Sequence, residues 1–185
     1  MKKNIIIISI VLLSFTAICQ SKNIKVEQIF VTNTMTGKSV KLFQSEETLK
    51  NFGKLIKVEV MDQAVHSEDY AKKYIFENVV FYVSTKGKIS SFETYSPTIL
   101  IEKKGIFSIS PGSSLTEVVT LFAEEVDNAV LTNDPTTTNQ YRCVRIKLAD
   151  FNKNTGNYVD IDYSLNLLYD PQTNILKKMN IWIRP

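Results

Sequence analysis

The chain has 185 residues with 22 Lys plus Arg, 19 Asp plus Glu, one His and two Cys, and 44% of the residues are apolar and 22% charged. This is the composition of an ordinary globular domain, and the length is sufficient for one sizeable core. It excludes a collagen, a coiled coil, a multi-span membrane protein and a disulfide-stapled miniprotein.

The first 19 residues have the pattern of a secretory signal. Met1–Asn4 is a short cationic segment, and Ile5–Ile18 is an apolar stretch interrupted only by Ser and Thr. Ala17 and Cys19 place small residues at the −3 and −1 positions of a cleavage site before Gln20. A retained membrane anchor is disfavoured because a span needs about 20 apolar residues. We therefore predict a signal peptide over 1–19 and a single exported domain over 20–185.

A lipoprotein signal is the alternative interpretation of this segment. Cys19 would then become the acylated first residue of the mature protein. Simple cleavage is favoured because Thr16 and Ile18 stand where such a signal usually has Leu and a small residue. Both interpretations predict a periplasmic or secreted protein with no transmembrane span in the mature chain.

Cleavage of the signal would also remove most of the net positive charge. The net charge of +3 includes Lys2 and Lys3, and residues 20–185 carry 20 basic and 19 acidic side chains. Neighbouring basic residues occur there only as pairs, with no run of five like charges. A nucleic-acid backbone is bound by a clustered basic surface, so we predict no nucleic-acid partner.

Alternating apolar and polar residues, rich in β-branched and aromatic types, predict that most of the chain is strand. Short turns such as Lys86–Gly87 and Asp170–Asn174 separate these segments and indicate antiparallel hairpins. The predicted strands are 24–32, 39–43, 78–84, 89–95, 99–102, 106–109, 141–151, 158–169 and 175–183.

Two segments break this alternation and predict helices. Ser114–Glu117 is a capping box, after which apolar residues recur at helical spacing as far as Val126. A shorter helix is predicted from Ser45 to Gly53, with acidic residues in its first turn. A further one or two turns are predicted over 67–74.

The order of helix followed by strands occurs twice along the chain. We therefore predict an α+β fold in which two helices pack on one face of an antiparallel sheet. The two helix-plus-strands sub-repeats are expected at about 20–104 and 105–185, although the identity between them is poor.

The register of the last three strands follows from matching their apolar faces. Placing Phe151 opposite Tyr158 puts Val144 opposite Leu165, and Leu165 is then placed opposite Met179. The reverse face of these strands gains two cross-strand pairs of opposite charge, namely Lys147–Asp162 and Asp160–Arg184.

Pro111–Val118, a turn feeding a capped helix that ends in Phe122, resembles the helix entry of small secreted proteins of the β-lactamase-inhibitor-protein and outer-membrane-assembly-lipoprotein type. Leu49–Gly53 resembles the helix exit of the same family, and the resemblance covers roughly 43–185. It implies a repeat of helix and antiparallel sheet that binds other proteins with an open sheet face and has no catalytic activity.

Motifs for catalysis or cofactor binding are missing from the sequence. There is no nucleophile elbow, phosphate-binding loop, zinc-binding His-Glu-x-x-His or Cys-x-x-Cys. His66 is followed by Ser67–Asp69, but neighbours in sequence rarely face one another, so an exposed loop histidine is favoured. Cys143 lies in a strand pattern that favours a half-buried structural thiol over a nucleophile. We predict no catalytic residues, no cofactor and no enzyme activity.

Asp160 and Asp162 point to one side of a strand and are the candidate ligands for a divalent cation. Two carboxylates opposite Lys147 and Arg184 are more typical of a charge-paired surface. No metal site is therefore predicted.

The reverse face of the last three strands is the candidate binding site. It combines residue types that dominate protein–protein interfaces. An equal alternative is that Trp182 covers the sheet against the first sub-repeat or the 132–139 loop. The predicted face comprises Tyr141, Arg145, Lys147, Tyr158, Asp160, Asp162, Trp182 and Arg184.

The favoured hypothesis is an exported protein-binding module that acts as an inhibitor or immunity protein against a toxin or secreted enzyme. An envelope assembly accessory anchored through Cys19 is the first alternative. A periplasmic hydrolase that uses His66 or the pair Asp160 and Asp162 is the second.

Overall fold

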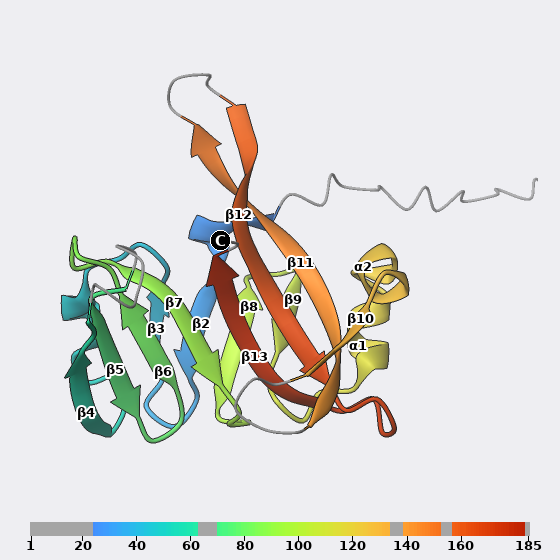
Figure 1. Ribbon diagram of the computed structural model, residues 1–185, viewed down its shortest axis with the longest axis horizontal. Helices are drawn as coiled ribbons and strands as arrows, with labels where there is room; N and C mark the ends of the chain where they lie inside the picture. The colour runs from blue at the N-terminus through green and yellow to red at the C-terminus, as the bar shows by residue number, and fades with distance from the viewer. Residues whose placement is uncertain (1–23, 63–69, 134–138, 153–156, 184–185) are drawn as a thin grey trace, which may run out of the picture.

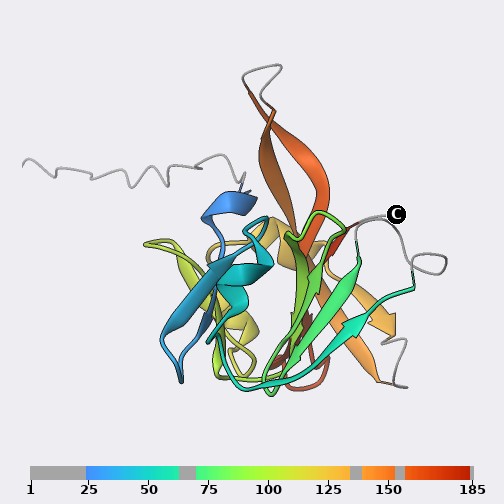
Figure 2. The same cartoon turned by 90° about the vertical axis from the view of Figure 1, so that its left-hand side faces the viewer.

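The computed structural model describes residues 24–62, 70–133, 139–152 and 157–183, with the backbone alone described for 150–152, 157–162 and 182–183. Strands account for 53% of the residues that the structure describes, and the helical elements are all short. The expected α+β fold, with two helices packed on a sheet face, is therefore wrong. The protein is mainly β, and its two sheets face one another (Figures 1 and 2).

The larger sheet has nine strands among the described residues, in the order β1-β11-β12-β13-β7-β6-β5-β4 with β10 also paired to β11. The strands from the two predicted sub-repeats therefore join in one sheet. Their bounds are β1 Ile24–Lys25, β4 Leu55–Val60, β5 Lys72–Phe76, β6 Val80–Val83, β7 Ile89–Thr94, β10 Val130–Asn133, β11 Gln140–Asn152, β12 Asn157–Tyr169 and β13 Leu176–Ile183.

The smaller sheet has the order β3-β2-β8-β9. Its strands are β2 Phe30–Asn33, β3 Lys38–Lys41, β8 Ile99–Lys103 and β9 Phe107–Ile109. The helical elements are the 3₁₀ turns η1 Val26–Gln28 and η2 Glu46–Leu49, and the short helices α1 Leu115–Val119 and α2 Ala123–Asp127.

One hydrophobic core lies between the two sheets. Val31 and Ile101 of the smaller sheet belong to the same buried cluster as Phe92, Leu165 and Ile181 of the larger one. Burial of apolar surface is the main favourable term in folding, so this shared core holds the two layers together. The β11–β12 hairpin extends beyond them (Figure 1).

The helix predicted from Ser114 is two short helices. Its capping box is present, but Phe122 leaves the helical conformation with φ −136° and ψ 45°. The Phe122 ring is buried and meets the Phe107 ring edge-on at 5.6 Å. The β-branched residues Val118–Thr120 also have lower helix propensity than Ala or Leu. Packing of one aromatic ring therefore accompanies the break in the helix.

The other two predicted helices are also not formed as expected. The helix expected from Ser45 is a single 3₁₀ turn, and Phe43 and Asn51 on either side have positive φ. Residues 72–74 of the third expected helix belong to strand β5, and 63–69 lie outside the described residues. The strands β4 and β10 were not predicted.

The register of the β11–β12 hairpin agrees with the prediction only near its tip. Phe151 lies opposite Tyr158, but the register shifts between Lys147 and Ala149, so that Val144 faces Leu167. The β12–β13 pairing has its own register shift between Leu168 and Tyr169, and Leu165 there faces Ile181 in place of the predicted Met179. A shift of two residues keeps each side chain on the same face, so the apolar faces still coincide although the predicted pairs do not.

Candidate binding surface on the larger sheet

The face of the larger sheet turned away from the core carries two rows of polar side chains, which we call the polar face. One row runs across four strands through Glu59, Lys73, Tyr82 and Ser91. The second row runs from β11 to β7 through Arg145, Asn166, Asn180 and Glu93.

The two halves of the sheet meet at a short seam between β13 and β7. Only Met179–Thr94 and Asn180–Glu93 are paired there. Lys178 and Glu93 form an ion pair of 3.1 Å across the seam, and 6% of the lysine side chain is exposed. Ser91 adds a short hydrogen bond from its hydroxyl to the carbonyl oxygen of Ile181. Side chains therefore supplement a ladder of few backbone pairs.

The middle of the polar face is a buried hydrogen-bond network. Asn166 Nδ2 donates to Asn180 Oδ1 at 2.9 Å, and Arg145 Nε donates to Asn166 Oδ1 at 3.4 Å. Lys178 Nζ lies 4.8 Å from the centre of the Tyr95 ring. Burial lowers the pKa of Lys178, but hydrogen bonds to Tyr95 and Glu93 outweigh this effect and raise it overall. The side chains in this part of the face are therefore held in place by one another, and we call this part the platform.

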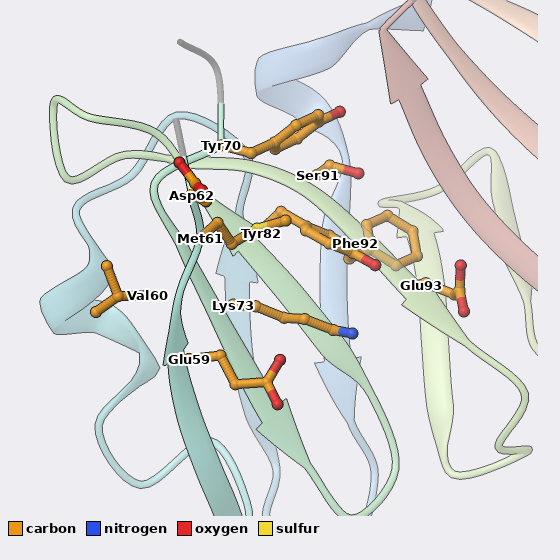
Figure 3. A pocket seen from close by; sticks show the side chains of 10 residues that line it. All are labelled: Glu59, Val60, Met61, Asp62, Tyr70, Lys73, Tyr82, Ser91, Phe92 and Glu93. Atoms are coloured by element: carbon orange, nitrogen blue, oxygen red, sulfur yellow. The ribbon is translucent and has the colours of Figure 1, made fainter. Parts of the chain in front are cut away.

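A cavity of about 460 Å³ lies at the β4 end of the polar face (Figure 3). It lies over strands β4 to β7. The lining residues are Glu59, Val60, Met61, Asp62, Tyr70, Lys73, Tyr82, Ser91, Phe92 and Glu93.

Two tyrosines and a lysine lie close together in the lining of this cavity. The rings of Tyr70 and Tyr82 meet edge-on at 5.4 Å, and Lys73 Nζ lies 5.9 Å from the centre of the Tyr82 ring. Figure 3 shows the Lys73 side chain between Tyr82 and Glu59. Burial, followed by the charge of Glu93, raises the pKa of Tyr82 to about 12. The Tyr82 hydroxyl is therefore neutral at neutral pH, a group that is able both to donate and to accept a hydrogen bond.

Glu59 brings a negative charge to the rim of the cavity. Its carboxylate accepts a hydrogen bond from Lys57 in an ion pair of 2.9 Å. That bond is the main reason that the pKa of Glu59 is lowered, and the charge of Lys73 acts in the same direction. The cavity therefore combines charged groups such as Glu59 and Lys73 with aromatic and apolar side chains.

A second cavity of about 610 Å³ lies near the turn between β12 and β13. Its lining includes Tyr95, Tyr141, Asp170 and Lys177. Tyr95 is 49% exposed, and it both covers Lys178 and lines this cavity. Exposed aromatic and charged groups therefore occur at both ends of the polar face.

The predicted binding residues occupy this face in part. Arg145 and Lys147 are exposed on β11, and Tyr141 of the same strand is 8% exposed. Lys147 faces Ser164, not the predicted Asp162, because of the register shift in the hairpin. Ser164 of β12 is in turn paired with Trp182 of β13.

The remaining predicted residues are placed by their backbone or lie outside the described residues. Tyr158 pairs with Phe151 and Asp160 with Ala149, while Asp162 lies within the shifted part of the hairpin. Arg184 lies outside the described residues, and so do Cys19 and His66. The pair Asp160–Arg184 is therefore not described.

The cavity itself was missed by sequence reasoning. Part of its lining comes from β4 and β5, and neither strand was predicted. The alternation of Lys57, Val58, Glu59 and Val60 was the available signal. Even with that signal, the meeting of Glu59 with Lys73 and Tyr82 depends on strand pairing.

Cys143 has the properties of a structural thiol. Its side chain is buried, and burial raises the pKa of the thiol. A reactive cysteine needs a lowered pKa and access to solvent, so this site does not favour nucleophilic chemistry. Among the described residues, no three His, Cys, Asp or Glu side chains gather as metal ligands.

Each helix in the described part of the chain falls short of the length and apolar character that a membrane span requires. Comparison of the chain with protein-family models, curated proteins and solved structures finds no match.

Proposed function

We propose that this protein is an exported protein-binding module that holds another protein against the polar face, as an inhibitor or immunity protein of a toxin or secreted enzyme. The observation that carries the proposal is the cavity over β4 to β7, which Tyr70, Tyr82 and Lys73 line. Tyrosine and arginine are enriched among the residues that contribute most to interface energy. A cavity beside them accepts an anchoring side chain of the partner.

The rigidity of the surface supports this function. Asn166, Asn180 and Lys178 are buried within the face and hydrogen-bonded or ion-paired there. A surface that is already ordered loses little conformational entropy when it binds. Arg145 and Lys147 supply charged groups beside this platform, and they belong to the face predicted from the sequence.

Site-specific photo-crosslinking in the producing cells tests the proposal. A photoreactive phenylalanine analogue replaces Met61, beside the cavity, or Lys147, at the far end of the face. The matched control replaces exposed Ser108 on β9 of the smaller sheet. We expect one covalent adduct of the same mass from both polar-face positions and none from the control.

Affinity measurements with the identified partner complete the test. Tyr82→Ala and Arg145→Ala should each weaken binding by roughly tenfold or more, the loss of an interface hot spot. Circular dichroism checks that both variants remain folded. Adducts that form equally well from Ser108, or unchanged affinity of both folded variants, would refute the polar face as the binding surface.

Export is a separate part of the proposal, and mass spectrometry of the mature N-terminus tests it. A chain that starts at Gln20 supports simple cleavage. A diacylated Cys19 supports the anchored envelope protein, and an uncleaved Met1 contradicts export through this signal.

A further inference from the structure

Strand β4 is an apolar edge of the larger sheet. It pairs with β5 on one side and is the last strand of the sheet among the described residues. Leu55, Ile56, Val58 and Val60 are 47%, 63%, 43% and 85% exposed. Exposed apolar edge strands tend to pair with other chains. The register of β4 against β5 shifts between Leu55 and Lys57, so 57–60 is the regular part of this edge.

The sequence of β4 is complementary to itself in the antiparallel direction. About Val58 as the centre, Lys57 is related to Glu59, and Ile56 is related to Val60. Residues directly opposite in an antiparallel pair share a face. Two copies paired about Val58 would therefore place each Lys57 opposite a Glu59, within the regular part of the strand.

Both charged groups are available for this pairing. Lys57 and Glu59 lie on the same side of the strand and already form an ion pair of 2.9 Å, with 62% and 36% of their side chains exposed. A second copy would convert this contact within one strand into two cross-strand pairs. Opposite charges facing each other stabilise a strand pair, whereas like charges destabilise it.

We propose that β4 pairs with β4 of a second copy of this chain, forming a two-fold symmetric dimer with a continuous sheet. The interface is isologous, with Val58 at the symmetry axis. Because one short strand from each chain is a small contact, the dimer is reversible and depends on concentration. Glu59 and Val60 also line the cavity. Dimerisation would therefore bring the cavities of the two copies close to the β4–β4 interface.

Charge-reversal variants of the exported protein test this pairing by sedimentation velocity over a concentration series. The unmodified protein should shift from monomer to dimer as its concentration rises. Lys57→Glu places Glu opposite Glu, and Glu59→Lys places Lys opposite Lys, so each variant should remain a monomer. An equimolar mixture of the two variants should form a heterodimer, because every opposed pair is again of opposite charge.

Two further variants distinguish this interface from nonspecific self-association. Val58→Lys places two lysines at the symmetry axis and should abolish the dimer. Ile106→Lys, at an exposed position between β8 and β9 of the smaller sheet, should leave it unchanged. Thermal unfolding of each variant verifies the fold. A monomer at every concentration, or a dimer that persists in the folded Lys57→Glu and Val58→Lys variants, would overturn the inference. Crosslinking from Met61 and Lys147 to another protein is a separate result and stands or falls on its own.

Discussion

Lys178 and Glu93 form an ion pair of 3.1 Å between strands β13 and β7, although the two residues stand 85 positions apart in the sequence. The pair lies where the two halves of the larger sheet are joined by few backbone pairs. Its position makes it a determinant of stability as well as a part of the polar face.

Loss of one partner of this pair should destabilise the fold. Glu93→Gln leaves the buried Lys178 ammonium without its counter-charge, and we expect a loss of about 3 kcal/mol in the free energy of unfolding. The double variant Glu93→Gln, Lys178→Met should lose less, because the unpaired charge is removed. Urea unfolding measures both, with Lys177→Met at the neighbouring exposed position as the control. Equal losses in the single and double variants would contradict this account.

The protein should lose stability in alkaline solution. The pKa of Tyr82 is about 12 in the folded protein and near 10 when unfolded, so between these values the unfolded chain binds fewer protons. Stability therefore falls as the pH rises through this range, by up to about 1.4 kcal/mol for each pH unit per tyrosine. The raised pKa of Lys178 acts in the same direction, because its contribution is complete below the unfolded pKa and is lost at higher pH.

Tyr82→Phe tests the origin of this alkaline loss. Urea unfolding at several pH values between about 9 and 11.5 should give a flatter dependence for the variant than for the unmodified protein. Tyr74, whose pKa is also raised to about 12 by burial and by its bond to Glu46, should retain its own share. An identical slope in the Tyr82→Phe variant would show that this tyrosine titrates normally.

Glu46 connects the η2 turn to strand β5, and its removal should destabilise the fold. Its carboxylate accepts hydrogen bonds from Lys72 Nζ at 2.8 and 3.0 Å and from the Tyr74 hydroxyl at 2.8 Å. Glu46→Ala should cost about 2 kcal/mol of stability, since it removes charged hydrogen bonds. Glu47→Ala, which removes only an exposed ion pair with Lys50, should have little effect.

The pH dependence of the same anchor has a defined sign. The hydrogen bond from Lys72 is the main cause of the lowered pKa of Glu46. A lowered carboxylate pKa contributes stability above the unfolded value and loses it as the pH falls. Denaturation of the Glu46→Gln variant should therefore depend less on acid pH than that of the unmodified protein; an unchanged dependence would contradict the prediction.

Gly53→Ala should disturb a buried contact between the η2 segment and β2. A Cβ atom at Gly53 would lie 2.8 Å from Asn33 Nδ2, which donates to the Phe52 carbonyl at 2.9 Å. Displacement of this buried amide should cost about 1–3 kcal/mol. Thermal unfolding of the Gly53→Ala variant checks this, with Lys54→Ala, exposed and next in sequence, as the control. A melting temperature equal to that of Lys54→Ala would show that Asn33 accommodates the methyl group.

Strand periodicity predicted most strands and the correct faces of β11, β12 and β13, since alternation is a local property of the chain. It did not predict the two-residue shift beyond Lys147, because a bulge keeps the faces and changes only the partners. It also failed at Phe122, where contact with the Phe107 ring accompanies the break in a helix that the capping box and the apolar spacing predicted. The part of the polar face on β11 was predicted from the sequence through Arg145 and Lys147. The cavity was not, because it depends on the pairing of strands β4 to β7.

The sequence by itself determined the near-neutral charge of residues 20–185, the strand-rich character of the chain and the alternation that separates apolar from polar faces. These properties depend on composition and on neighbours in the chain. Only the tertiary structure decided that the strands form two facing sheets, that Lys178 meets Glu93, and that Glu59, Lys73 and Tyr82 surround one cavity. Those contacts join residues through strand pairing and packing, which no local pattern specifies.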